Sequence, residues 1–171
     1  QRLLSCLGTN HPHMIDLGLP SGTKWACCNV GATVPDDFGN YYAWGETSEK
    51  TIYNSDTYQY NNVDLDINIA GSNYDVARAQ WGSSWQMPSQ SQMEELLDYC
   101  SSKRTTLNVV NGFEFVGTNG GRIFLPSAGF RVNNELSLTD SEGHYWSSTR
   151  FVLSPEDAFY LNFNSYEKEM K

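Results

Sequence analysis

One pronounced helical pattern limits what this chain can fold into. Over residues 89–100, apolar side chains recur at positions i, i+3, i+4 and i+7 from Met93, as on one face of an α-helix. Ser89 and Gln92 match the capping-box sequence that begins a helix. A shorter helical pattern covers Tyr74–Gln80. The other regular patterns are of strand type, so the sequence predicts an α+β fold: an antiparallel sheet with one or two helices and long loops.

The strand-type segments are short and are separated by turn sequences. Asn111-Gly112 is the strongest hairpin signal and predicts a turn that joins strands over 107–110 and 113–116. Residues 47–72 are rich in Asn, Tyr and Asp without an apolar period, and predict a long surface loop. The other expected strands are Met14–Leu17, Lys24–Val30, Arg122–Leu125, Tyr145–Ser148 and Ala158–Asn164.

Length and charge narrow the classes of protein further. The 171 residues suit one domain, which we expect over residues 14–171 after an N-terminal segment of residues 1–13. With 11 Lys and Arg against 20 Asp and Glu, the formal net charge is −9, which disfavours nucleic acid and anionic membranes as partners. No apolar run approaches the roughly 20 residues of a transmembrane helix, so no membrane span is expected.

Four cysteines allow three disulfide patterns. Adjacent Cys27 and Cys28 point to opposite sides of a strand, which disfavours a bond between them. Because Cys100 lies on the apolar helix face, its partner should also point inward; we expect Cys28 with Cys100, which leaves Cys6 for Cys27. Four buried free thiols are the alternative. Leu3–Cys6 also resembles the end of a lipoprotein signal, so a lipid anchor at Cys6 is a second hypothesis.

Candidate catalytic residues are few. His11 and His13 lie near the N-terminus, where two ligands two residues apart are weak evidence for a metal. His144 has no nucleophile geometry beside it in the sequence. Glu46 follows an aromatic run, and there we favour a carboxylate that accepts hydrogen bonds from the backbone or from tryptophan. We therefore expect neither an enzyme nor a resident metal.

One polar segment imitates a calcium-binding loop. Asp64–Asn68 carries acceptor side chains at alternate positions, and Asp75 stands where a last ligand would follow. Ile69 occupies the position at which such a loop requires glycine. An incidental polar loop is the favoured interpretation, and one calcium ion within residues 56–75 is the alternative. No other cofactor is expected.

The last predicted strand has two different faces. Phe159, Leu161 and Phe163 alternate with polar residues, so the apolar set is expected inside and the polar set outside. Tyr and Asn on an outer face are typical of adaptable binding surfaces, and an ordinary solvent-facing strand has the same pattern. The expected ligand-binding residues are Tyr160, Asn162 and Asn164 on the strand, with Arg150, Phe151, Glu156, Asp157 and Tyr166 around it.

Six motifs, in order along the chain, resemble the Fibrobacter succinogenes major paralogous domain. They are Asp16–Ala26, Cys28–Ala32, Tyr41–Glu46, Tyr74–Arg78, Trp81–Pro88 and Tyr145–Ser148. The resemblance implies a C-type-lectin-like fold, related to formylglycine-generating and sulfatase-modifying domains, in secreted or surface-anchored bacterial proteins. Some relatives with this fold are variable proteins of diversity-generating retroelements, and residues 145–166 look like their variable region. The sugar-binding signatures of calcium-dependent lectins and the copper-binding cysteine pair of formylglycine-generating enzymes have no match in this sequence.

The resemblance and the outer strand face together predict a non-enzymatic, extracellular ligand-binding domain. We expect it on the outer-membrane surface of a Gram-negative bacterium or secreted from one, with a protein or a glycan as ligand. The rival hypotheses are a retroelement-diversified receptor, a structural or pilus-associated module and, with the least support, a glycan-modifying enzyme centred on Glu46 or His144.

Overall fold

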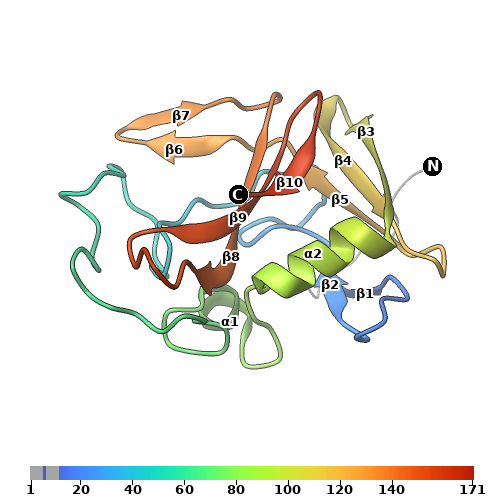
Figure 1. Cartoon of the computed structure of the whole chain (residues 1–171). Coiled ribbons are helices and arrows are strands. Elements are labelled where there is room, and N and C mark those ends of the chain that lie inside the picture. The colour runs from blue at the N-terminus through green and yellow to red at the C-terminus, as the bar shows by residue number, and fades with distance from the viewer. Residues whose placement is uncertain (1–5, 7–11) are drawn as a thin grey trace.

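Ten short strands and two helices form the regular part of the chain in a computed structural model, which describes residue 6 and residues 12–171 (Figure 1). All strand pairs within the sheets are antiparallel, so the predicted α+β class is confirmed. The helices are α1 (Val76–Trp81) and α2 (Gln90–Tyr99). The strands are β1 (Met14–Asp16), β2 (Lys24–Ala26), β3 (Ser101–Leu107), β4 (Val110–Val116), β5 (Arg122–Pro126), β6 (Phe130–Val132), β7 (Glu135–Ser137), β8 (Gly143–Arg150), β9 (Ala158–Phe163) and β10 (Lys168–Met170).

Helix α2 begins as the sequence predicts. The Ser89 hydroxyl accepts a hydrogen bond from the backbone N–H of Gln92, and the Gln92 side chain accepts one from the N–H of Ser89. The helix buries Met93 and Leu96 against the main core. This core also receives side chains from the segment after β1 and from β4, β5 and β9: Leu17, Leu19, Phe115, Ile123, Leu125, Leu161 and Phe163. Helix α2 therefore joins the two larger sheets, whose strand orders are β3-β4-β5 and β10-β9-β8.

The β3–β4 hairpin turns at Asn108 and Val109, so the turn predicted at Asn111-Gly112 is wrong. Asn108 and Val109 have φ values of 48° and 64°, and a positive φ at both central residues is typical of a type I′ turn. Asn111 and Gly112 lie inside the β3–β4 ladder instead. A side chain at Gly112 would collide with the carbonyl oxygen of Leu125, so this glycine permits the close approach of β5.

Residues 27–75 contain no helix or strand and follow a long irregular path between β2 and α1 (Figure 1). The loop expected over residues 47–72 is confirmed, but it is not entirely on the surface. Leu65 and Ile69 are buried in a second core beside Trp44 and residues of α1. This irregular segment therefore has an interior of its own.

The cysteines only partly follow the expected pattern. Cys6 and Cys27 form a disulfide, whereas Cys28 and Cys100 are both buried free thiols, so the Cys28–Cys100 bond is a wrong prediction. The two thiols belong to separate cores: Cys28 packs with Cys6, Cys27 and Ala32, and Cys100 packs in the main core. Burial, with a smaller contribution from Asp37, raises the pKa of the Cys28 thiol to about 11.

Two N-terminal hypotheses fall mainly outside the described residues. His11 and the stretch Leu3–Ser5 of the lipoprotein-like sequence are not among them. The backbone N–H of His13 lies 3.3 Å from the Cys27 sulfur and donates to it. Within residue 6 and residues 12–171, neither helix is long and apolar enough to cross a bilayer.

Candidate functional site

A cavity of about 790 Å³ lies where the irregular segment meets β8. Its wall is formed mainly by residues of the segments 22–30, 38–58 and 81–88 and by the first half of β8. We call it the aromatic cavity, because many of the lining residues carry rings. Among them are Tyr41, Tyr42, Trp44, Tyr58, Trp85 and Trp146. A large concave site lined by rings is the usual form of a small-ligand pocket.

Two indole hydrogen bonds fix the irregular wall to β8. Trp44 Nε1 donates to the carbonyl oxygen of Ser147 at 2.8 Å, and Trp146 Nε1 donates to the carbonyl oxygen of Tyr42 at 3.1 Å. Trp44 is buried, while Trp146 keeps 41% of its surface exposed. The irregular segment therefore donates to the backbone of β8, and β8 donates to the backbone of the irregular segment. This pair of bonds holds the two walls together at this edge of the cavity.

Three tyrosine hydroxyls hold the backbone behind the wall. Tyr41 donates to Ala128 O at 2.7 Å, Tyr53 to Tyr41 O at 2.7 Å and Tyr58 to Trp44 O at 2.8 Å. Burial raises the pKa of Tyr41 and of Tyr58 to about 12. Both hydroxyls therefore keep their protons, and with them their donor role, far above neutral pH.

Glu46 lies at the base of this network and is 1% exposed. Its Oε1 accepts hydrogen bonds from Lys50 Nζ at 3.0 Å and from the backbone N–H of Gln59 at 2.8 Å, so a backbone donor is confirmed and the tryptophan alternative is not observed. The Lys50 ammonium also lies over the rings of Tyr53 and Tyr58, 5.4 and 5.9 Å from their centroids. These contacts make Glu46 a structural residue at its Oε1 atom.

Among the described residues that line the cavity, two buried polar atoms have no hydrogen-bond partner. They are Glu46 Oε2, an acceptor, and Trp25 Nε1, a donor. Leaving such groups unpaired costs stability, and the great majority of buried polar atoms are paired. Both atoms are buried, so neither is open to a ligand in the cavity as the side chains lie here.

A second cluster of rings covers the outer face of β8 and β9. Tyr160 stacks on His144 with centroids 5.5 Å apart and meets Trp146 edge to face at 5.8 Å. Phe130 of β6 contacts His144 at 4.8 Å. We call Phe130, His144, Trp146 and Tyr160 the outer aromatic patch. Because His144 and Trp146 also line the aromatic cavity, the patch and the cavity are continuous.

The predicted row on β9 is only partly exposed. Leu161 and Phe163 are fully buried, as expected, but Asn162 is 2% exposed, so its outward position is a wrong prediction. Its Nδ2 donates to Gly143 O at 3.2 Å and lies 3.3 Å from the His144 ring, so β8 occupies this amide. Asn164 accepts hydrogen bonds from the N–H groups of the following turn, at Tyr166 and Glu167.

Arg150, one of the predicted ligand-binding residues, is buried and paired within the protein. It is 8% exposed, its Nε donates to Leu65 O at 2.8 Å, and its Nη2 pairs with Asp64 at 2.6 Å. The end of β8 packs against the irregular segment there, since the N–H of Arg150 bonds to Ile67 O. Arg150 therefore anchors residues 64–67 of the irregular segment to the end of β8.

The remaining predicted residues lie around the β8–β9 connection. Glu156 is exposed and lines the aromatic cavity. Phe151 stacks on Phe159 with centroids 3.9 Å apart, and so keeps Phe159 half-buried instead of fully inside. Asp157 accepts a hydrogen bond from Ser154 at 2.6 Å, and Tyr166 is 97% exposed. Of the predicted set, Tyr160 and Glu156 are therefore the residues next to the cavity.

The calcium-like segment does not assemble into an ion site. Both oxygens of Asp75 are occupied by backbone N–H groups of Gly71, Arg78 and Met87, and Asp64 is paired with Arg150. Asp75 is fully buried and is the N-cap of α1. It is a structural acceptor, so its oxygens are already used where the spacing places a last calcium ligand. The favoured interpretation, an incidental polar loop, agrees with these contacts.

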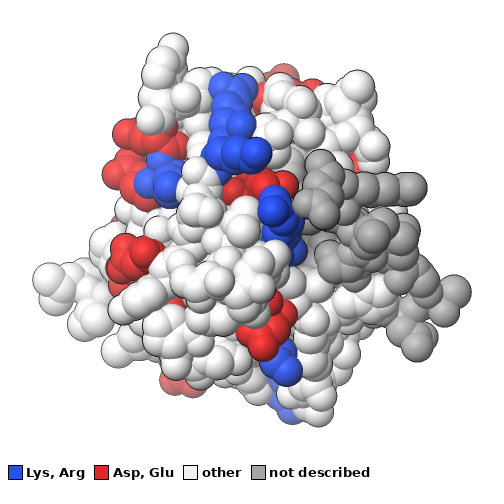
Figure 2. Space-filling model, turned by 90° about the vertical axis from the view of Figure 1, so that its right-hand side faces the viewer, with Lys and Arg blue, Asp and Glu red and all other residues white. Residues whose placement is uncertain are grey.

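Charge is dispersed on the face shown in Figure 2. Lys and Arg alternate there with Asp and Glu, and uncharged side chains cover most of the described surface.

Comparisons of the chain with protein-family models, with curated proteins and with solved structures find no match.

The sequence interpretation did not identify the aromatic cavity. Tyr41–Trp44 and Trp81–Trp85 supply much of its wall, and both stretches combine a high density of rings with no helical or strand period. The signal that could have identified this wall is a high density of aromatic residues without a helical or strand period, in a chain of low charge.

Proposed function

We propose that this protein is a non-enzymatic ligand-binding domain of an extracellular bacterial protein, with the C-type-lectin-like fold of the Fibrobacter succinogenes major paralogous domain family. The observation that carries the proposal is the aromatic cavity, which continues into the outer aromatic patch through His144 and Trp146. The Cys6–Cys27 disulfide supports a domain that works outside the cytosol, because disulfides persist in oxidising compartments.

The chemistry of the wall favours a glycan as the ligand. A sugar ring has an apolar C–H face that packs on aromatic rings, and its hydroxyls both donate and accept hydrogen bonds. The cavity supplies rings such as Trp146 and Tyr42, together with the exposed polar side chains of Gln86 and Glu156. A glycan therefore satisfies the apolar and the polar features of this site together.

The contacts of the two acid–base candidates support binding over catalysis. Glu46 Oε1 is held by Lys50 and Gln59, and His144 Nε2 lies 2.8 Å from Glu142 and within a stack of rings. Neither group is arranged as a general base beside a nucleophile. Both therefore contribute to the shape of the site.

The test is binding of the purified domain to a glycan array, followed by titration of any hit with Trp146→Ala, Tyr160→Ala and Tyr99→Ala. Tyr99 lies on α2 with 54% of its surface exposed, and is the matched control for loss of an exposed ring. We expect Trp146→Ala to weaken binding by about tenfold or more, since a buried ring contact is worth about 1.5 kcal/mol or more. Tyr99→Ala should bind like the parent.

A parallel arm contains a calcium chelator. Because Asp64 and Asp75 are occupied by protein donors, we expect the same affinity with and without calcium. Unchanged binding in both patch variants would contradict the proposed site. A blank array with the folded parent protein would contradict the glycan ligand and direct the search to proteins.

A further inference from the structure

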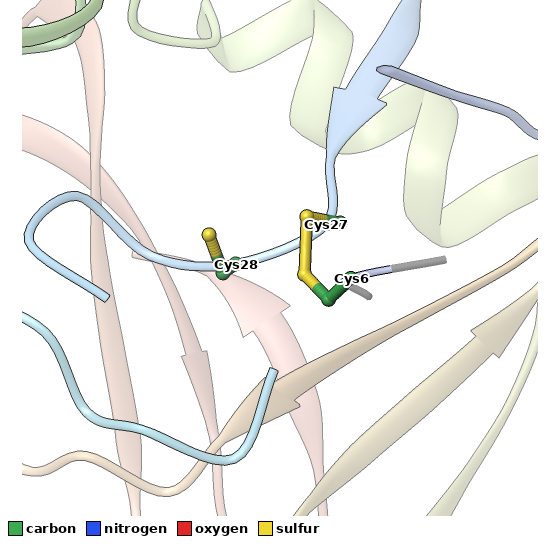
Figure 3. A group of neighbouring side chains, drawn as sticks. All are labelled: Cys6, Cys27 and Cys28. Carbon is green, nitrogen blue, oxygen red and sulfur yellow. A yellow bond between two sulfur atoms is a disulfide. The ribbon is translucent and has the colours of Figure 1, made fainter. Parts of the chain in front are cut away.

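Three cysteine sulfurs meet at the start of the irregular segment. The Sγ atoms of Cys6, Cys27 and Cys28 all lie within 4.8 Å of one another (Figure 3). Cys6 and Cys27 form the disulfide, and the free Cys28 thiol lies beside it. Cys28 is therefore a third sulfur donor at this place, and it takes no part in the cross-link.

The surroundings of the cluster are those of a closed sulfur site. Relative exposures are 3% for Cys6, 3% for Cys27 and 7% for Cys28, and Ala32 and Ile15 pack around them. The backbone N–H of His13 already donates to the Cys27 sulfur at 3.3 Å, a contact that also stabilises a thiolate. No carboxylate belongs to this group of ligands. A set of three sulfurs shielded from water is typical of sites for soft metal ions.

We propose that reduction of the Cys6–Cys27 disulfide converts this cluster into a three-thiolate site for a soft metal ion of the Cu(I) class. A dithiol reductant supplies the two electrons and two protons: it becomes a cyclic disulfide, and Cys6 and Cys27 become thiols. Binding of the ion then releases the three thiol protons to solvent as three sulfur–metal bonds form. The site and the disulfide exclude each other, and the proposal does not depend on the glycan ligand.

The spacing suits one ion. With metal–sulfur bonds of about 2.3 Å, three sulfurs around a trigonal ion lie about 4 Å apart. The observed sulfurs lie within 4.8 Å of one another, so after reduction the two bonded sulfurs need only separate by side-chain rotation. The ion would then tie the N-terminal segment at Cys6 to the end of β2 in place of the disulfide.

The experiment measures Cu(I) binding under anaerobic conditions. The full chain is reduced with dithiothreitol, desalted, and titrated with Cu(I) in competition with a chromogenic chelator. We expect one Cu(I) per reduced chain and none bound tightly by the oxidised chain. Cys28→Ser should weaken the affinity of the reduced chain by at least about 100-fold, because it removes a ligand atom. Cys100→Ser, at the free thiol of the main core, should bind like the parent.

Thermal unfolding separates site loss from fold loss, since reduction also removes a cross-link. Cu(I) should raise the Tm of the reduced parent and of Cys100→Ser, and leave the Tm of reduced Cys28→Ser unchanged. Equal binding by the oxidised and reduced parent, equal affinity of Cys28→Ser, or no rise of Tm in the reduced parent would overturn the proposal.

Discussion

The strands after α2 and the irregular segment of residues 27–75 pair their backbone N–H and C=O groups in different ways. In the sheets of β3–β5 and β8–β10, backbone N–H and C=O groups pair with each other along antiparallel ladders. In the irregular segment, side chains such as Tyr58, Glu46 and Asp75 take much of this role. Buried backbone groups need partners in both regions, so the irregular one depends on individual side chains.

The largest effect is expected from the sheet region, where packing dominates. Phe115→Ala removes a fully buried ring from the main core, and should lower the free energy of unfolding by about 3–5 kcal/mol. Urea denaturation followed by circular dichroism measures this value. Leu153→Ala, at a side chain that is 97% exposed, is the control and should stay within about 0.5 kcal/mol of the parent. A loss below about 1 kcal/mol for Phe115→Ala would contradict the assignment of this core.

The next effect tests the irregular region through one carboxylate. Asp75→Ala leaves the N–H groups of Gly71, Arg78 and Met87 without their acceptor, and should cost about 2–4 kcal/mol. The same urea titration measures it, with the exposed Asp66→Ala as the control for loss of one negative charge. If the two acidic variants were equally stable, side-chain acceptors would not hold this region.

The smallest effect is a pH dependence that separates the regions. The pKa of Tyr58 is about 12 in the folded protein, against about 10 unfolded, so the unfolded chain loses this proton first. Its contribution is complete below pH 10 and is lost as the pH rises toward 12. Urea midpoints measured across this range should show a smaller slope for Tyr58→Phe than for the parent. An unchanged slope would contradict the buried donor role.

The correct sequence predictions concern features that depend on residues close together in the chain. The capping box at Ser89 and Gln92 and the buried side of β9 at Leu161 and Phe163 depend on spacing within a few residues, and the structure contains both. The position of Gly112 shows the limit of such reasoning. Asn-Gly is a turn signal in isolation, but here β5 requires the space that the glycine leaves.

The site was less predictable because its polar residues have distant partners. Arg150 bonds to the segment at Leu65, and Asn162 bonds across to β8, so both side chains are buried, although the alternation along β9 predicted an outward Asn162. Cys28 and Cys100 are both buried, but they pack in different cores. A two-residue period shows which residues share a side of a strand; it does not show what covers that side.

The indole hydrogen bonds of Trp44 and Trp146 hold the cavity wall from both sides of its contact with β8. The exposed side chains of the β8–β9 connection, such as Leu153 and Glu156, take no part in these bonds. Substitutions at the rim can therefore change the preferred ligand while the framework stays constant, as antibody loops vary on a fixed β-sandwich.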